Sequence, residues 1–200
     1  MKFTTGLVRL SYAHLFKPYS QAGNDPKYSA ALLFPKSDKR TIDRLHKALE
    51  DIKKDDYSKT KWAGKGGVIG KIDSPVHDGD VEKEEDPTYK GMYYLNAKAN
   101  PDRPPKIVDK DRNDIVDQSE VYSGCWVQAV LTFFPYNANG HKGIGVGLAA
   151  IRKIKDGPSL AGGTTVTDAD FLVSAVVKIY LSCFICCFHS RSPNYLSLWR

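Results

Sequence analysis

The feature that most constrains the fold of this chain is a pair of long alternating segments joined by a short turn. Residues 121–134 and 143–155 flank the sequence PYNANGHK. Apolar residues occupy every second position from Cys125 to Phe133 and again from Ile144 to Ala150. Alternation with a period of two is typical of a strand with one buried face, and the pair Asn139-Gly140 is a strong signal for a tight turn. The sequence therefore predicts a long strand pair here.

The second strand of this pair has glycine at alternate positions along one face. Glycine inside a strand lowers its stability, because it packs no side chain and loses the most entropy on ordering. If the apolar faces of both strands line the core, the glycines Gly143, Gly145 and Gly147 share the opposite surface with the outward residues of the first strand. We expect the core faces to hold Cys125, Val127, Ala129, Leu131, Phe133, Ile144, Val146, Leu148 and Ala150, and the outward face of the first strand to hold Trp126, Gln128, Val130, Thr132, Phe134 and Tyr136. This arrangement predicts a shallow trough with a bare floor and aromatic walls.

Two explanations of the bare floor are open. In the functional one, the trough admits a sugar-phosphate backbone closely while aromatic rings stack on bases, and Lys98 and Arg152 neutralise phosphates. In the structural one, glycine accommodates the tight coiling of a small barrel, or lets a neighbouring aromatic ring lie flat over the strand. The structural explanation is the more usual one for glycines inside strands, and the pattern alone does not decide between them.

The rest of the chain supplies further strands and one clear helix. Residues 6–16, 28–34 and 92–100 have the composition or the alternation of strands, and residues 106–109 form a short extended piece. Apolar residues recur at helical spacing from Ser37 or Asp38 to about Lys54, whereas residues 55–91 are polar, rich in glycine and predicted as a long loop. Regular helices do not separate the strands, which excludes a doubly wound parallel sheet and favours a small mixed or antiparallel barrel with an inserted helix.

Charge and cysteine content add little about the function. The formal net charge is +6, but half of it comes from residues 174–200, which contain three basic residues and no carboxylate. Global charge is therefore weak support for a nucleic-acid partner, and local placement of charge has to carry the argument. Cys125 is the one cysteine before residue 174, which is typical of a reducing compartment, and the first residues lack the pattern of a secretory signal.

Residues 119–157 resemble the last strand pair of a phage-encoded family of single-stranded DNA-binding proteins with an oligonucleotide/oligosaccharide-binding (OB) barrel. The matching elements are the entry VYSGC, the long aromatic strand, the turn into GIGV, and the closing IRKIKDG. The resemblance extends more loosely over residues 3–160. It implies a mainly β protein, with an OB-type five-stranded β-barrel, an inserted α-helix and long loops, in residues 1–157. It also implies sequence-tolerant binding of single-stranded DNA during phage DNA replication or recombination in the bacterial cytoplasm, without catalysis or a cofactor.

The trough and the resemblance together suggest which residues bind DNA. Sequence-tolerant binders combine aromatic stacking platforms with positive charge along a groove. The stacking candidates are Tyr94, Trp126, Phe134 and Tyr136, with Tyr12, Phe16 and Tyr28 as weaker ones. The candidates for phosphate or backbone contacts are Lys98, Arg103, Lys106, Arg152 and Lys153, with Gly143, Gly145 and Gly147 as the bare floor. Besides DNA, phage or host replication and recombination proteins are the partners that the resemblance suggests, and a membrane is not.

The end of the chain departs from the family pattern. Residues 158–173 are predicted as a flexible, mildly acidic linker, and residues 174–200 as an atypical apolar tail rich in cysteine. The tail is open to three interpretations: a membrane-associated or partner-binding segment, a metal site at Cys183, Cys186, Cys187 and His189, or translation out of the ancestral reading frame. The abrupt change of composition favours the last. Reading the gene beyond the codon for Val173 in the other frames tests it, since an ancestral acidic terminus must then appear.

Two other functions remain as alternatives. The carboxylates of residues 78–86 (Asp78, Asp80, Glu82, Glu84, Glu85 and Asp86) could hold Mg²⁺ in a metal-dependent nuclease. Alternatively, the trough aromatics belong to the core of a structural or protein-interaction barrel. No Ser-His-Asp or Cys-His arrangement can be argued from the sequence, so no enzyme is predicted.

Overall fold

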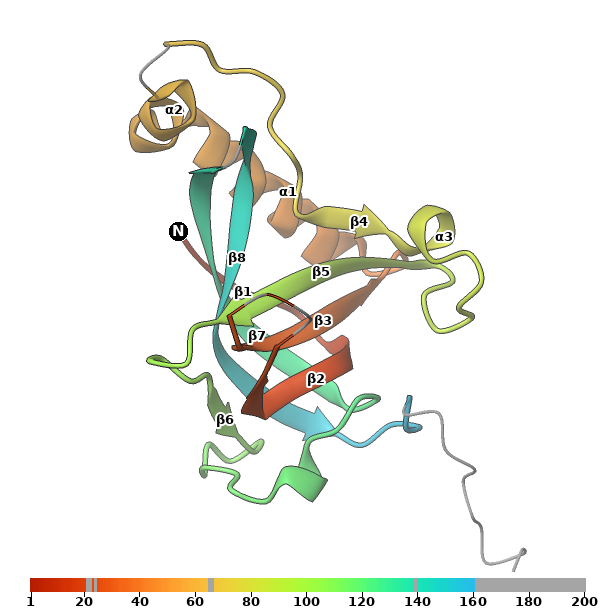
Figure 1. The fold of residues 1–200 in the computed structure, drawn as a ribbon. Coiled ribbons are helices and arrows are strands. Elements are labelled where there is room, and N and C mark those ends of the chain that lie inside the picture. The colour runs from red at the N-terminus through yellow and green to blue at the C-terminus, as the bar shows by residue number, and fades with distance from the viewer. Residues whose placement is uncertain (21–22, 24, 65–66, 139, 161–200) are drawn as a thin grey trace, which may run out of the picture. The chain divides into compact units, whose positions relative to one another are not determined.

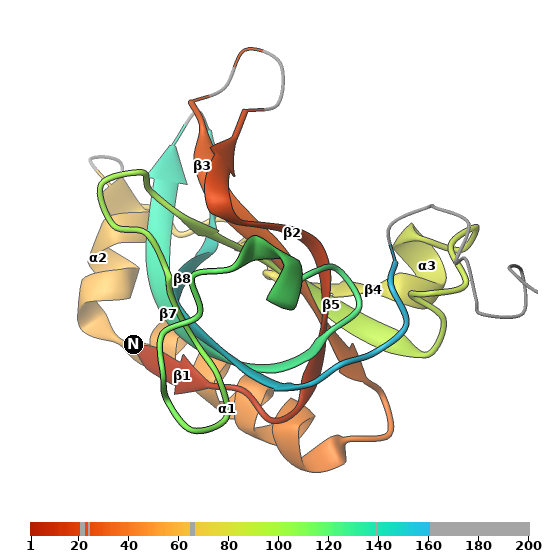
Figure 2. The same cartoon turned by 90° about the horizontal axis from the view of Figure 1, so that it is seen from below.

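Five strands close into a ring in the computed structural model, which describes residues 1–160 except 21–22, 24, 65–66 and 139 (Figure 1). The strands are β2 (Val8–Tyr19), β3 (Lys27–Pro35), β5 (Met92–Ala99), β7 (Trp126–Ala138) and β8 (His141–Lys155). Around the ring their order is β7-β2-β3-β5-β8, and β8 pairs again with β7. Figure 2 looks toward one end of this ring. If β2, β3, β5, β7 and β8 are renumbered 1 to 5, their order around the ring is 1-2-3-5-4, and strands 3 and 5 are parallel. This is the strand order of an OB barrel. The predicted fold class is confirmed.

Three short strands extend the ring at its edges. β1 (Lys2–Thr4) runs antiparallel to β7, β4 (Val76–Asp78) runs antiparallel to β5, and β6 (Lys106–Val108) runs parallel to β8. The closure between β5 and β8 is slight, since one residue pair, Lys98 with Gly147, is in register there. The ring is therefore closed between β5 and β8 at this one residue pair.

The core follows the alternation that the sequence predicts. All five inward residues predicted before the turn, from Cys125 to Phe133, are buried, and so are Ile144, Val146 and Leu148. The alternation of β8 then breaks, because Leu148 pairs with Leu131 and Ala150 with Val130, which leaves Ala149 as an extra residue. Consequently Ile151 faces the core in place of Ala150, and the prediction of an inward Ala150 is wrong.

The predicted helix is α1 (Lys39–Lys54), and its start is fixed by Asp38. The Asp38 carboxylate accepts a hydrogen bond from the backbone N–H of Thr41, which satisfies a donor that the first helical turn leaves unpaired. Ile42, Leu45 and Leu49 are buried on one face, as their spacing predicts. The helix closes one side of the barrel core.

Residues 55–91, predicted as a long loop, contain further structure. They form α2 (Asp56–Ala63), β4 and the single turn α3 (Gly79–Glu82), and η2 (Gln118–Glu120) is a later short helix. The side chain of Trp62 on α2 is fully buried among residues of the barrel core. Among the described residues, no helix is long and apolar enough to cross a membrane. Residues 158–160 of the predicted linker are described, whereas its remainder and the predicted tail 174–200 lie outside the described residues.

Candidate nucleic-acid interface

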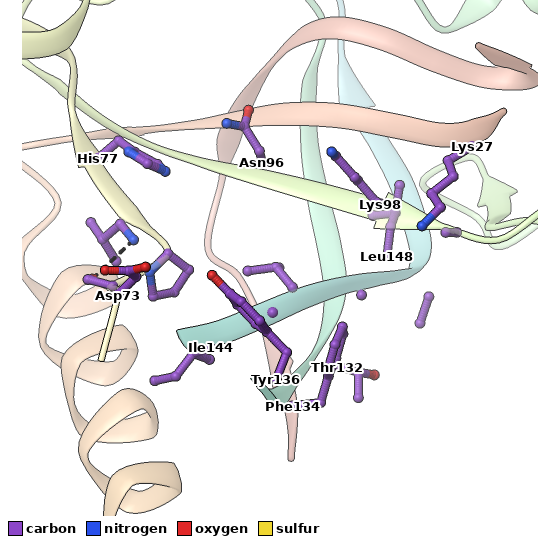
Figure 3. Close-up of a pocket in the computed structure, with 18 of the residues that line it drawn as sticks. Lys27, Asp73, His77, Asn96, Lys98, Thr132, Phe134, Tyr136, Ile144 and Leu148 are labelled. Atoms are coloured by element: carbon purple, nitrogen blue, oxygen red, sulfur yellow. Dashed lines mark hydrogen bonds between the residues drawn. The ribbon is translucent and has the colours of Figure 1, made fainter. Parts of the chain in front are cut away.

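A groove of about 1520 Å³ runs between β5, the β7–β8 hairpin and residues 71–77 (Figure 3). We call it the β5–β8 groove. Residues of β5 and β8 on both sides of their one paired position, Lys98 with Gly147, supply part of its lining. Its lining includes Lys27, Lys71, Asp73, His77, Glu82, Asn96, Lys98, Arg103, Thr132, Phe134, Tyr136, Gly145 and Gly147. The groove contains part of the predicted trough, namely Thr132, Phe134, Tyr136, Gly145 and Gly147, and it has a third wall that the sequence did not reveal.

Two aromatic rings lie on the glycines of β8. Phe134 pairs with Gly145 and Tyr136 with Gly143 across the hairpin. A Cβ atom added to Gly145 would lie 2.5 Å from the Phe134 ring, and one added to Gly143 would lie 2.8 Å from ring carbons of Tyr136. Real side chains do not approach that closely, so each ring occupies the space that a side chain at the glycine would need. In Figure 3 the side chains of Phe134 and Tyr136 lie next to each other beside β8.

The structural explanation of the glycine pattern therefore holds for Gly143 and Gly145, and the functional explanation stays a prediction. The glycines let neighbouring rings lie flat, as the structural explanation states, but Phe134 stays 46% exposed and both rings line the groove. Each ring therefore contacts the strand and also lines the groove. Gly147 is different, because a Cβ atom there would meet the carbonyl oxygen of Thr132 at 3.4 Å, an ordinary contact. It is the part of the floor that stays bare.

The hairpin under these rings is held from behind by α2. The indole N–H of Trp62 donates to the carbonyl oxygen of Gly143 over 3.0 Å. The side-chain amide of Asn137 donates to the carbonyl oxygens of Lys61 and Trp62 at the end of α2, where helix carbonyls lack partners of their own. On the groove side, the backbone N–H of Asp73 donates to the carbonyl oxygen of Lys142 over 2.8 Å. The hairpin is thus fixed along both sides.

The charge lining the groove is predominantly positive. Lys27, Lys71, Lys98 and Arg103 face two carboxylates, those of Asp73 and Glu82. Within the described part of the chain, none of these four cationic side chains is in an ion pair. Glu82, in contrast, already contacts the His77 imidazole at 2.9 Å. The four cations therefore have no carboxylate partner among the described residues.

The prediction that Tyr94 is a stacking platform is wrong. Tyr94 is 6% exposed, with the His77 ring stacked on it at 4.9 Å and Tyr89 packed edge-on at 5.1 Å. Its hydroxyl donates to a Glu82 carboxylate oxygen over 3.0 Å, and burial together with this hydrogen bond raises the pKa of Tyr94 to about 12. The residue lies on the outer face of β5 as predicted, but β4, α3 and the residues after them cover it.

Three other candidates do not line the groove. Trp126 precedes Phe134 by eight residues on β7, which is about 26 Å of extended strand. Its ring lies 5.4 Å from the Lys155 ammonium. Arg152 donates to the side-chain oxygen of Gln128 over 2.5 Å, and Lys153 pairs with Asp156 at 2.8 Å, which raises the pKa of Lys153. The structure does not bring Trp126, Arg152 and Lys153 to the groove.

The remaining candidates lie on adjoining surfaces. Phe16, Tyr28 and Lys106 line a second, smaller pocket of about 510 Å³, in which Lys106 lies 3.2 Å from Asp114. Pro104 lines both this pocket and the β5–β8 groove. Tyr12 is exposed on β2, outside both. Gly143 lies beneath the Tyr136 ring and does not line the groove itself.

Several groove residues were not predicted as site residues. Asn96 shares the outer face of β5 with Lys98, so alternation alone could have identified it. Lys27, Lys71 and His77 reach the groove through strand register and through the path of residues 71–77, neither of which a local pattern reveals.

Three carboxylates of the acidic run, those of Asp78, Asp80 and Glu82, are in contact with basic side chains. The Lys36 ammonium lies 2.6 Å from Asp78 and 2.7 Å from Asp80, and these contacts raise the pKa of Lys36 and lower that of Asp80. In residues 1–160, as far as they are described, no three histidine, cysteine or acidic side chains gather as a metal site. The arrangement ties α3 to β3.

Comparison with known proteins identifies the family. The chain matches the family described as "Enterobacter phage Enc34, ssDNA-binding protein" over residues 1–178. It belongs to this family. The chain is also 31% identical over 182 residues to "Putative protein p50" of Acyrthosiphon pisum secondary endosymbiont phage 1, covering 86% of this chain and 92% of that protein. The resemblance predicted from residues 119–157 is confirmed.

Solved structures of similar proteins share the fold. The single-stranded DNA-binding protein from bacteriophage Enc34, solved in complex with single-stranded DNA, has a TM-score of 0.66 and 28% identity, covering 80% of this chain and 89% of that one. The single-stranded DNA-binding protein gp2.5 of bacteriophage T7 has a TM-score of 0.57 at 16% identity, covering 83% and 98%. At that identity, the second likeness concerns the fold alone.

Proposed function

We propose that this protein binds single-stranded DNA in the β5–β8 groove with little sequence preference. It coats strands exposed during phage DNA replication or recombination in the cytoplasm of the bacterial host. The observation that carries the proposal is the pair of rings on the glycines of β8, because each presents a free face to the groove. Every base has a π face, so stacking on such rings tolerates any sequence and contributes about 1–3 kcal/mol per base.

The chemistry of the groove matches the parts of a single strand. In this proposal Phe134 and Tyr136 stack on bases, and Lys98 and Arg103, which line the same groove, neutralise phosphates. The Enc34 protein, a member of the same family, is solved with single-stranded DNA. The family membership and the groove support the same ligand independently.

The protein acts by binding and not by catalysis in this proposal. A nuclease would need free carboxylates to hold its metal ions in reach of the phosphates. Asp78 and Asp80 are instead paired with Lys36, and Glu82 is bonded to His77 and Tyr94. Incubation of a labelled oligonucleotide with Mg²⁺ tests this directly, and cleavage that a Glu82→Gln variant abolishes would contradict it.

Fluorescence anisotropy of the full chain with a labelled oligo(dT) across a salt series tests the binding. For single strands, log K falls with log salt by about 0.7 per neutralised phosphate, so four groove cations predict a slope of about −3. Lys98→Ala is expected to make the slope of log K against log salt shallower by about 0.7. Lys59 is an exposed lysine on α2, and Lys59→Ala is expected to leave the slope unchanged. Duplex and RNA competitors measure the preference for single strands and for deoxyribose. Failure to bind at low salt, or equal competition by duplex, would overturn the proposal.

A further inference from the structure

A second group of aromatic side chains lies on the outer surface of β2, beyond the β5–β8 groove. Tyr12 is 58% exposed and Tyr19 is 54% exposed. The rings of His14 and Tyr19 stack on each other, with their centroids 4.4 Å apart and their planes 12° from parallel. We call Tyr12, His14 and Tyr19 the β2 aromatic surface.

Tyr12 holds a backbone conformation that a bulky residue seldom adopts. Its φ is +46°, in the left-handed region. The pairing of β2 with β3 shifts register between Ser11 and His14, so Tyr12 belongs to a bulge. Contacts on either side fix the bulge: Tyr89 donates to the Ser11 hydroxyl over 3.3 Å, and the backbone N–H of Ala13 donates to the Ser123 hydroxyl over 3.1 Å. The fold thus maintains a strained residue whose ring is in solvent, a combination that concentrates at binding sites.

Strand register connects this surface to the groove. His14 pairs with Ser29, Ser29 with Lys98, and Lys98 with Gly147 on the groove floor. Paired residues on neighbouring strands project to the same side, so this row crosses four strands on the outside of the barrel, a span of about 14 Å. Farther along the same strands, Tyr19 pairs with Lys27, which itself lines the groove. The two surfaces are continuous.

We propose that a single strand leaving the β5–β8 groove crosses β3 and continues onto the β2 aromatic surface. There its bases stack on Tyr12 and on the exposed part of the His14–Tyr19 pair, and Lys27 contacts the phosphate between the two surfaces. The inference rests on the proposed function. A continuing strand is the ligand that suits both surfaces, because it repeats a π face and a phosphate at each step.

The test measures affinity against oligonucleotide length. Oligo(dT) of about 4 to about 16 nucleotides spans the site sizes of OB folds. The full chain is compared with Tyr12→Asn, which tolerates the left-handed conformation, and with Tyr19→Ala. Tyr57→Ala is the matched control, because Tyr57 is 68% exposed but lies on α2. The Tm of each variant shows that it is folded.

Each variant on β2 is expected to bind the longest oligonucleotides about fivefold or more weakly, and the shortest as wild type does, because a short strand fills the groove alone. Tyr57→Ala is expected to match wild type at every length. A merely structural Tyr12 would change the Tm of Tyr12→Asn without this dependence on length. Equal affinity of wild type and both variants at all lengths, or equal loss at all lengths, would overturn the inference while leaving the proposed function intact. A wild-type protein that binds no oligonucleotide would overturn both.

Discussion

A ring that lies flat on a glycine gains close contact on one face and keeps the other face free. Phe134 on Gly145 is the best exposed case, since its ring fills the space of the missing side chain and remains 46% exposed. The glycine removes two possible obstacles at once, a Cβ atom that would lift the ring and a side chain that would compete for the groove. Gly145 lowers the stability of the strand, but it makes room for the ring of Phe134, its paired residue on β7.

Substitution of Gly145 by alanine is expected to displace the Phe134 ring. The new Cβ atom would lie 2.5 Å from ring carbons, so the side chain must rotate away, at a cost of about 1–3 kcal/mol in stability. Loss of one stacking face should weaken binding of single-stranded DNA by at least about fivefold. Urea denaturation and anisotropy titration measure the two effects.

Gly147→Ala is the matched control, two residues along on the same face of β8. Its Cβ atom would meet the Thr132 carbonyl oxygen at 3.4 Å, so it fits without rearrangement. We expect unchanged or slightly higher stability, by about 0.5–1 kcal/mol, because alanine loses less entropy than glycine in a strand. Equal losses of stability in the two variants would contradict the conclusion that the Phe134 ring occupies the space of a side chain at Gly145.

At the scale of elements, α2 acts as a brace for the hairpin. Trp62 is fully buried, and its indole N–H is the partner of the Gly143 carbonyl. Trp62→Phe keeps an aromatic ring but leaves this carbonyl unpaired, which is expected to lower the free energy of unfolding by about 1–3 kcal/mol. Because Gly143 also carries the Tyr136 ring, DNA affinity should fall too. Trp126→Phe, at a half-buried site, is the control, and equal stability losses for both variants would contradict the brace.

The segment from β4 to α3 is anchored by ion pairs, and this gives stability a dependence on pH. The Lys36 ammonium and the Gly91 N–H hold the pKa of Asp80 below its usual value of 3.8. A carboxylate with a lowered folded-state pKa stabilises the protein above the unfolded-state pKa, and this contribution disappears as the pH falls through the folded-state pKa. Asp80→Asn should therefore have a lower Tm than wild type at neutral pH, and the difference should close in acid.

Thermal unfolding followed by circular dichroism from neutral pH to about pH 2 measures this difference. Asp102→Asn is the control, because Asp102 is exposed and is in no ion pair among the described residues. A gap between wild type and Asp80→Asn that stays constant with pH would show that the carboxylate contributes through shape and not through its charge.

Some features of the helices and strands can be predicted from the local sequence pattern alone. The alternation around β7, the spacing of Ile42, Leu45 and Leu49, and the capping position of Asp38 each depend on neighbours within a few residues, and the structure agrees with all of them. The burial of Tyr94 depends on His77 and Tyr89, which arrive from a different segment, so alternation on β5 identified its face but not its covering. Likewise α2 has no strong apolar periodicity, so the sequence did not predict it as a helix. It packs against the barrel core mainly through the buried Trp62.

At the scale of the whole molecule, strand order decides which predicted residues meet. Phe134, Tyr136, Lys98 and Arg103 come from three segments and line one groove because β5 and β8 close the ring side by side. Trp126 and Arg152 share strands with groove residues, yet neither of them lines the groove. Composition and alternation predict whether a residue faces the core or the solvent. Which residues of other strands lie beside it depends on strand register and bulges, and the sequence pattern of one strand does not contain that information.

Binding in a groove that spans the closure of the ring should stabilise the whole barrel. A ligand that binds the folded state at about 100 times its Kd adds about 2.7 kcal/mol to the free energy of unfolding. For a domain of this size, that corresponds to a rise in Tm of about 5 to 10 °C. We expect oligo(dT) to produce this rise, a duplex at the same nucleotide concentration to produce less, and added salt to reduce the rise at fixed oligonucleotide concentration because Kd increases. Scanning calorimetry with the full chain measures all three. An equal rise with duplex would mean that charge alone drives the interaction, since stacked base pairs cannot offer their faces to Phe134 and Tyr136.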